Sequence, residues 1–287
     1  MKSKKRMVAE KHEQIFRNGS KTYYFSSHFF PPAVRRDVYA LYGFVRVADN
    51  LVDDQPVDPA AFHAFRRTYT EALTSGKASG DVIIDAFLEL HRRKHFDPAW
   101  TEAFLDSMEH DLSSSTCETL DEVLTYIYGS AEVIGLYMAR IMDLSEKASG
   151  YAAMLGRAMQ YINFIRDIQE DLEIGRRYLP LDKSSLSSLD SAYTQKHPLQ
   201  FKAFIREEVK RYQLWQKEAE KGYGYIPRRY RIPIMTAADM YCWTAQQIAK
   251  DPFIVYEKRV KPPKSRILRK GIAHTLGVAL PCRILKR

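Results

Sequence analysis

Several features that are common in other classes of protein are scarce or absent in this chain of 287 residues. Glycine is sparse, at 13 residues, and runs that alternate apolar with polar residues, the pattern of half-buried strands, are hard to find. No apolar run approaches the roughly 20 residues of a membrane-spanning helix, and the basic N-terminal segment lacks the apolar core of a signal peptide. The three scattered cysteines lack the spacing of a zinc site. These absences argue against a sheet protein, a membrane-spanning protein and a zinc protein, and they fit a cytoplasmic chain.

Segments with helical periodicity make up most of the sequence instead. The predicted helices cover residues 5–19, 32–54, 58–75, 81–94, 99–112, 119–143, 147–173, 197–222 and 234–250. The polar segment 183–191 has the composition of a loop and does not mark a domain boundary. We therefore predict an all-α, single-domain fold.

Positive charge is concentrated at the C-terminal end of the sequence. Residues 258–287 contain ten Lys or Arg and no Asp or Glu, whereas residues 1–257 contain 34 basic against 35 acidic residues. No nucleic-acid-binding motif accompanies this charge, so we expect no nucleic-acid partner. Basic residues flanking the apolar stretch 272–280 instead favour contact with an anionic membrane surface.

One predicted helix carries a polar stripe on an otherwise apolar surface. At about 100° per residue, Gln160, Asn163, Asp167 and Asp171 fall within an arc of roughly 80°. The surrounding residues are nearly all apolar, and a helix that is apolar on most sides is usually buried. Because a buried carboxylate needs a cation or a metal beside it, the stripe indicates a binding site inside the protein.

A second predicted helix repeats this arrangement far away in the sequence. Tyr42, Arg46, Asp49 and Asp53 share an arc of roughly 60°, and the positions around them are mostly apolar. One Asp-x-x-x-Asp pair is usually a solvated helix face. Two such pairs, each on an apolar helix, predict a site built from opposed carboxylates.

Opposed carboxylates in a helical bundle have three main uses. A di-iron centre is disfavoured, because no histidine lies three residues after an acidic residue of either stripe. General acid and base chemistry on a sugar is a second use, for which an all-helical scaffold is unusual. The third is magnesium binding, in which aspartates share Mg²⁺ with substrate phosphates. The metal would then offset the charge of a diphosphate leaving group.

Together with their surroundings, the two stripes resemble the metal-binding motifs of the squalene/phytoene synthase family, whose members are head-to-head prenyltransferases. "YGFVRVADNLVDD" (42–54) resembles the first motif, and "LGRAMQYINFIRDIQED" (155–171), followed by "GRRYLP" (175–180), resembles the second. Further matching segments are 19–31, 126–135, 237–243 and 257–264. The resemblance covers nearly the whole chain. It implies an isoprenoid-synthase-type helical bundle over residues 1–260, followed by a basic amphipathic tail at 261–287.

The resemblance also implies a role for each matching residue. Mg²⁺, with Mn²⁺ as an alternative ion, is expected on the aspartates Asp49, Asp53, Asp167 and Asp171. The residues expected to bind the substrate diphosphates are Ser20, Thr22, Tyr23, Arg46, Gln160, Asn163, Arg166 and Arg259. The tyrosines expected to stabilise carbocations with their ring faces are Tyr42, Tyr128 and Tyr241. Two positions depart from the family pattern, Asn50 within the first motif and Glu132 where relatives often have a small residue.

The implied reaction joins two allylic diphosphates through a cyclopropylcarbinyl diphosphate. The segment 231–260 looks most like prokaryotic phytoene synthases, so we expect phytoene from two geranylgeranyl diphosphates, without NADPH. A C30 product (squalene, dehydrosqualene or hydroxysqualene) made from farnesyl diphosphate is the alternative. A non-catalytic assembly factor at a membrane is an alternative from another class, although retention of all four aspartates disfavours it. We expect peripheral association with the inner face of the membrane, and the sequence gives no oligomeric state.

Overall fold

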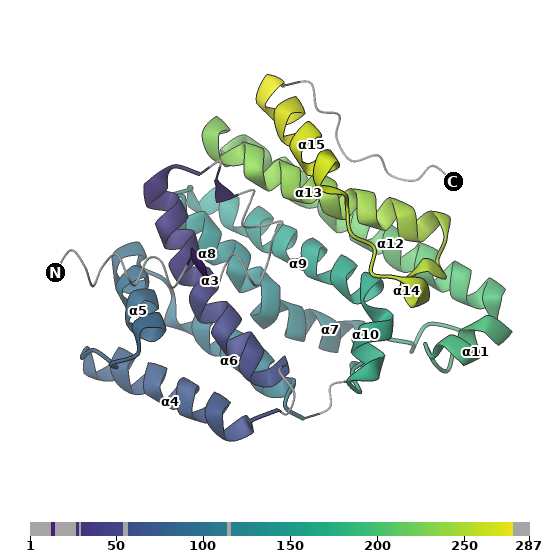
Figure 1. The fold of residues 1–287 in the computed structure, drawn as a ribbon, viewed down its shortest axis with the longest axis horizontal. Helices are drawn as coiled ribbons and strands as arrows, with labels where there is room; N and C mark the ends of the chain where they lie inside the picture. Colours follow the sequence, from purple (N-terminus) through teal and green to yellow (C-terminus); the bar gives the residue numbers. More distant parts are fainter. Residues whose placement is uncertain (1–12, 15–26, 29, 54–56, 114–115, 278–287) are drawn as a thin grey trace.

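The computed structural model describes residues 13–14, 27–28, 30–53, 57–113 and 116–277, which form helices and loops with no strand among them (Figure 1). The polar stripes lie on α3 (Pro32–Asp53) and on α9 (Ser149–Arg166), which α10 (Ile168–Glu173) continues. The other elements are α4 (Pro59–Ser75), α5 (Val82–Lys94), α6 (Pro98–His110), α7 (Leu120–Ile127), η1 (Tyr128–Glu132), α8 (Val133–Ile141), η2 (Glu146–Ala148), α11 (Ser191–Lys196), α12 (Pro198–Glu220), η3 (Lys221–Tyr225), α13 (Arg228–Lys250), α14 (Ile254–Glu257) and α15 (Lys264–Leu276). The prediction of an all-α fold is confirmed.

Most predicted helices agree with the structure to within a few residues, but two long ones are interrupted. The predicted helix 119–143 consists of α7 and α8 joined by the π-helical turn η1. The predicted helix 147–173 breaks at Asp167, whose backbone has φ −101° and ψ 18°. Helix α13 begins at Arg228, earlier than predicted, and α11, α14 and α15 were not predicted. Of the predicted helix 5–19, only residues 13–14 are described, and they are helical.

Aspartate side chains begin three consecutive helices of the N-terminal half. Asp58 accepts a hydrogen bond from the backbone of Ala61, and Asp81 and Asp97 cap α5 and α6 in the same way. Each cap satisfies an N–H group that has no partner within the helix, and is worth about 1 kcal/mol. These local signals fix where the outer helices start.

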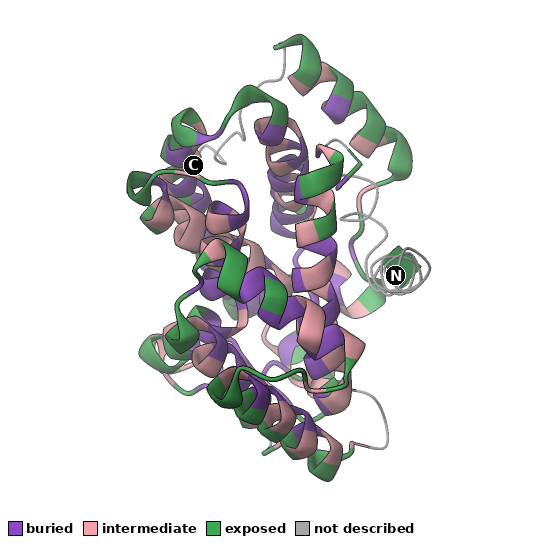
Figure 2. Ribbon diagram, turned by 90° about the vertical axis from the view of Figure 1, so that its left-hand side faces the viewer, coloured by how far each residue is buried: buried purple, intermediate pink, exposed green. Residues whose placement is uncertain are grey.

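The core consists of two groups of buried side chains on either side of the central helices. One lies between α3, α5, α6 and α8, where Phe44 stacks on Phe87 with ring centroids 4.0 Å apart. The other surrounds the C-terminal half of α9 and includes the fully buried Tyr161 and Phe201. Helix α9 contacts η1, α8, α12 and α13, so it is the central helix of the bundle. Figure 2 shows that buried residues face the interior and that exposed residues gather on the outer helices.

Two glycines allow α8, with the preceding η1 turn, to approach α9 very closely. A Cβ atom on Gly135 would lie 2.1 Å from the carbonyl oxygen of Ala152, and one on Gly156 would lie 2.3 Å from that of Ala131. Any side chain at these positions would overlap the neighbouring backbone. The pairing of 135 with 152 and of 131 with 156 also shows that the two segments run antiparallel.

The basic C-terminal segment, predicted as a tail at 261–287, is helical over much of its described part. Helix α15 packs along α13 (Figure 1), while residues 278–287 lie outside the described residues. Across the described part of the chain, no helix combines the length and the apolar character needed to cross a membrane.

Candidate active site

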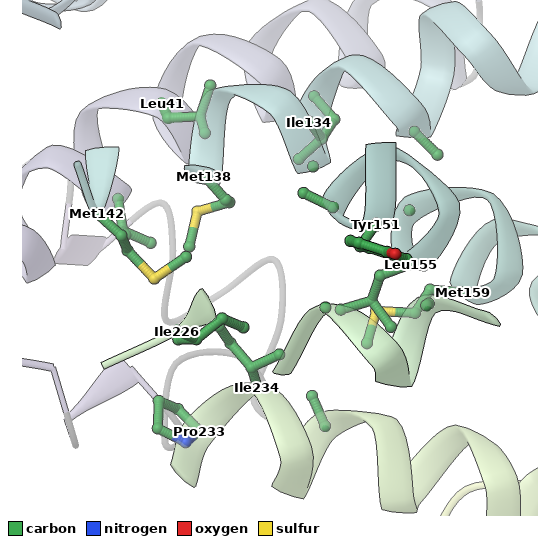
Figure 3. Close-up of a pocket in the computed structure, with 18 of the residues that line it drawn as sticks. Leu41, Ile134, Met138, Met142, Tyr151, Leu155, Met159, Ile226, Pro233 and Ile234 are labelled. Carbon is green, nitrogen blue, oxygen red and sulfur yellow. The ribbon is translucent and has the colours of Figure 1, made fainter. Parts of the chain in front are cut away.

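An elongated cavity of about 370 Å³ runs through the middle of the bundle (Figure 3). Its walls come from α3, η1, α8, α9 and α13 together with the loops around them, and they are almost entirely apolar. The labelled residues are Leu41, Ile134, Met138, Met142, Tyr151, Leu155, Met159, Ile226, Pro233 and Ile234. A cavity of this shape and composition suits a flexible hydrocarbon chain.

The lining of the cavity changes from apolar to polar toward the C-terminal ends of α3 and α9. On α3, Val38 and Val45 line the apolar part, and the same helix face continues to Asp49. On α9, Gly156 lines the apolar part, and the same face continues through Gln160 to Asp167. The predicted polar stripes therefore adjoin one end of an apolar cavity. A ligand with an apolar chain and an anionic head group would complement both the apolar walls and the polar end.

Each aspartate of the first stripe is paired with an arginine. Arg46 Nη1 donates to Asp49 Oδ2 at 2.5 Å, and Arg176 Nη1 donates to Asp53 Oδ1 at 2.6 Å. Arg176 also donates to the backbone carbonyls of Val52, at 3.0 Å, and of Asp111, at 3.2 Å. These three bonds fix the Arg176 guanidinium against the end of α3.

The second stripe is held by two further arginines. Arg166 donates two hydrogen bonds to the carboxylate of Asp167, at 2.6 and 2.5 Å. Arg259, which follows α14, donates to Asp167 Oδ2 at 2.6 Å. Arg259, which we expect to bind a substrate diphosphate, therefore lies beside the second stripe, although the two positions are 92 residues apart.

Arg176 also connects the two stripes. Besides its hydrogen bond to Asp53, its backbone N–H donates to the carbonyl of Asp171 at 2.8 Å, so it contacts a residue from each stripe. Arg176 was not among the site residues predicted from the sequence, although its position directly after the second motif was a signal for it.

Two of the aspartates have strongly raised pKa values. Burial raises the pKa of Asp49 to about 7, the charge of Asp53 adds to this shift, and the attraction of Arg46 opposes it. Burial and the charge of Asp167 raise the pKa of Asp171 to about 8. Raised carboxylate pKa values at one end of a cavity are typical of a site that is completed by additional positive charge.

The three predicted tyrosines have different positions. Tyr42 and Tyr241 line the cavity, and burial raises the pKa of Tyr42, so its hydroxyl is neutral near pH 7. Tyr128 is 41% exposed and does not line the cavity, although its neighbours Ser130 and Ala131 do. Tyr128 begins the π-helical turn, which changes the direction of the following side chains relative to a regular α-helix.

A buried cluster that the sequence analysis did not identify lies beside the first stripe. Asp111 accepts hydrogen bonds from the hydroxyls of Tyr126, at 2.6 Å, and Tyr178, at 2.8 Å. Burial raises the pKa of Asp111, and its charge in turn contributes to the raised pKa of Asp49. Asp111 belongs to neither stripe, so periodicity gave no signal for it.

The remaining predicted residues divide into two groups. Gln160 and Asn163 line the cavity on α9, where it meets the acidic end. Ser20, Thr22 and Tyr23 lie outside the described residues.

The oxygen donors at the polar end suit a hard divalent cation. Mg²⁺ prefers carboxylate and amide oxygens and usually shares them with substrate phosphates. Asn163 Oδ1 is buried and has no hydrogen-bond partner within the described residues, an arrangement that a bound cation would relieve. In the same part of the chain, no three His, Cys, Asp or Glu side chains converge as ligands of one ion. An ion on either aspartate pair would therefore need oxygens from the substrate as well.

Comparison with known proteins agrees with this geometry. The family model described as "Squalene/phytoene synthase" matches residues 16–266. The chain belongs to the squalene/phytoene synthase family. The 15-cis-phytoene synthase of Paracoccus sp. (strain N81106 / MBIC 01143) is 28% identical over 256 residues, or 86% of this chain and 84% of that protein. The chloroplastic phytoene synthase of Daucus carota is 27% identical over 87% of this chain, which spans 65% of that longer protein.

Solved structures of family members share the fold. Squalene synthase HpnC from Alicyclobacillus acidocaldarius superposes with a TM-score of 0.77 at 20% identity, covering 86% of this chain and 95% of that one. A dehydrosqualene synthase in complex with a ligand also gives 0.77, at 21% identity, covering 96% and 98% of the two chains. The predicted isoprenoid-synthase-type fold is thereby confirmed.

Proposed function

We propose that this protein is a phytoene synthase, which condenses two geranylgeranyl diphosphates head to head and releases two diphosphates. The observation that carries the proposal is the apolar cavity that ends at two facing aspartate stripes. Relatives from a bacterium and a plant are named phytoene synthases, which supports the C20 substrate.

The residues at the polar end have the chemistry to bind diphosphate groups. Arg46, Arg166, Arg176 and Arg259 are all held there by aspartates. A planar guanidinium can donate two hydrogen bonds to a phosphate group, which suits it to this role. Mg²⁺ on Asp49, Asp53, Asp167 and Asp171 would supply the charge that stabilises diphosphate as it leaves.

The apolar walls have a separate task in this proposal. When the carbon–oxygen bond of one substrate breaks, the remaining allylic cation must react with the double bond of the second substrate before water reaches it. The almost entirely apolar lining excludes water. The rings of Tyr42 and Tyr241 supply negative faces toward the cavity, each worth up to about 2 kcal/mol to a desolvated cation.

The balance of the reaction explains why no reductant is expected. Formation of the cyclopropane ring releases one diphosphate and one proton. Loss of the second diphosphate, rearrangement and loss of a second proton then give phytoene, so no electrons are added. Squalene formation replaces the second proton loss with hydride transfer and needs NADPH.

A C30 synthase acting on farnesyl diphosphate is the second candidate. It is favoured by the structural neighbours, which are named squalene synthase and dehydrosqualene synthase. A non-catalytic assembly factor is disfavoured, because the four aspartates are all present and arginines lie beside them. We further propose that the enzyme works at an anionic membrane surface, reached through its basic C-terminal segment.

The deciding experiment is an incubation of the purified protein with Mg²⁺ and either the C15 or the C20 diphosphate, with and without NADPH. Chromatography and mass spectrometry of the extracted hydrocarbon identify the product. Phytoene from the C20 substrate, made at the same rate without NADPH, supports the proposal. A C30 hydrocarbon as the main product contradicts it, and a reduced C30 product that requires NADPH assigns squalene synthesis.

A further inference from the structure

Helix α15 has an unusual distribution of polar and apolar side chains. Its large apolar residues Leu268, Ile272 and Leu276 are 63%, 52% and 68% exposed. They are spaced four residues apart, so they form one outward stripe within an arc of about 80°. A helix on the surface of a soluble protein normally turns such residues inward.

The opposite face of α15 is fixed to the protein by charged groups. Lys270 Nζ lies 3.2 Å from Asp239 Oδ2 on α13, and His274 Nε2 lies 2.5 Å from the same oxygen. The Arg266 guanidinium packs over the ring of Trp243, at 5.7 Å from its centroid. These contacts hold α15 in the orientation that leaves the apolar stripe outside, because turning the helix inward would separate Asp239 from both partners.

We propose that the stripe of Leu268, Ile272 and Leu276 is a docking surface for an anionic phospholipid bilayer. The charge around the stripe favours this partner. Lys264 lies one turn before Leu268, Arg269 follows it, and both are exposed. Residues 258–287 contain no acidic residue. Apolar side chains between cations match the acyl chains and the anionic headgroups of a leaflet.

The position of α15 relative to the cavity gives this contact a purpose. Ala237 and Tyr241 of α13 line the cavity, whereas Asp239, two residues from each, binds α15. Two residues correspond to about 200° on a helix, so α15 lies on the opposite side of α13 from the cavity. A bilayer on α15 would thus be separated from the cavity by α13 and α15 alone. The choice of a lipid partner rests on the proposed function, because isoprenoid substrates and a hydrocarbon product would be exchanged with that bilayer.

The test compares the wild-type protein with two variants in vesicle sedimentation. The first variant carries Leu268→Ser, Ile272→Ser and Leu276→Ser. The control carries Leu199→Ser and Leu214→Ser on α12, where both leucines are also exposed, at 79% and 56%. Vesicles contain phosphatidylcholine with or without phosphatidylglycerol. Circular dichroism and thermal unfolding establish that each variant is folded.

We expect wild type and control to bind the anionic vesicles alike and the α15 variant to bind at least about tenfold more weakly. Binding to vesicles without phosphatidylglycerol should be weak for all three proteins. Undiminished binding by the α15 variant would overturn the proposal, as would absence of wild-type binding or equal loss in the control.

Sedimentation velocity without lipid tests the other occupant, a second copy of the chain. A wild-type dimer that the α15 substitutions convert to a monomer, together with no vesicle binding, would assign the stripe to self-association and overturn the proposal. Vesicle binding requires no turnover. If the protein binds vesicles through α15 but makes no hydrocarbon, the missing product refutes the proposed function, while the binding supports this inference.

Discussion

Replacement of Met138 by Trp is expected to change which substrate the protein accepts. Met138 lies on α8 and points into the cavity near Met142, away from Met159 (Figure 3). Its depth follows from the helix geometry. Gly156 of α9 lies level with Ala131 of the antiparallel segment. Asn163 is seven residues from this level along α9, and Met138 is seven residues from it along α8, toward the other end of the cavity. At 1.5 Å per residue, Met138 is about 20 Å from the level of Asn163.

This depth separates the two candidate substrates. A carbon–carbon bond advances an extended chain by about 1.25 Å, so the main chain of a C20 prenyl group spans about 19 Å and that of a C15 group about 14 Å. With its diphosphate at the polar end, the C20 chain reaches Met138 and the C15 chain does not. Denying space to one five-carbon unit costs up to about 4 kcal/mol, or about 10³-fold in kcat/KM.

The assay measures kcat/KM for both diphosphates with wild-type protein and with Met138→Trp. We expect the ratio of C20 to C15 use to fall by up to about 10³-fold. Met159→Trp is the matched control. It adds the same volume next to Gln160, near the polar end, and should impair both substrates to a similar extent. An unchanged ratio in Met138→Trp, or an equal shift in the control, would refute the assignment of the deep end of the cavity.

Three further predictions concern the metal, its pH dependence and the helix packing. Asp167→Asn or Asp171→Asn should lower turnover by at least about 10²-fold, because the amide lacks the charge that holds Mg²⁺, while circular dichroism remains unchanged; near-normal turnover would remove these residues from the metal site. The pKa values of Asp49 and Asp171 are raised to about 7 and about 8, so Mg²⁺ must displace protons from these carboxyls near neutral pH. The affinity of the protein for Mg²⁺ should therefore rise between pH 6 and 8.5. Calorimetry that shows no such rise would argue against these residues as ligands. Gly156→Ala should destabilise the protein by about 1–3 kcal/mol in urea unfolding, whereas Gly150→Ala in the same helix meets no atom within 4 Å and should be tolerated.

The helices and both stripes could be predicted from the sequence because they depend on local periodicity. Spacing alone places Asp49 with Asp53, and Asp167 with Asp171, on common helix faces. It does not reveal which arginine meets which aspartate. Arg176 and Asp53 are 123 residues apart, and only the packing of the bundle brings them together. The prediction of facing stripes came instead from the apolar character of both helices, and the family resemblance supported it.

The features that sequence analysis missed have specific physical causes. Periodicity identifies helices of several turns, so α14, with 4 residues, falls below what it can detect. Across 126–135, the π-helical turn shifts the directions of the side chains away from those of a regular helix with 3.6 residues per turn. As a result, Tyr126 lies in the buried Asp111 cluster, whereas Tyr128 is at the surface. Helix α15 was described only as a basic amphipathic segment, because nothing local indicates that Asp239 would hold its charged face inward.

The positions of the aspartates explain why this site requires more positive charge than its arginines supply. Asp53 is the last residue of α3, where the helix dipole is negative, so its carboxylate is disfavoured there rather than stabilised. Asp49 lies one turn earlier, and the charge of Asp53 contributes to the raised pKa of Asp49. Arginine pairing offsets this cost, but the four arginines only balance the four aspartates. Two diphosphates bring several further negative charges to the same region, and added divalent cations would compensate them. This charge balance is the physical argument for Mg²⁺ binding more tightly together with the substrate than in its absence.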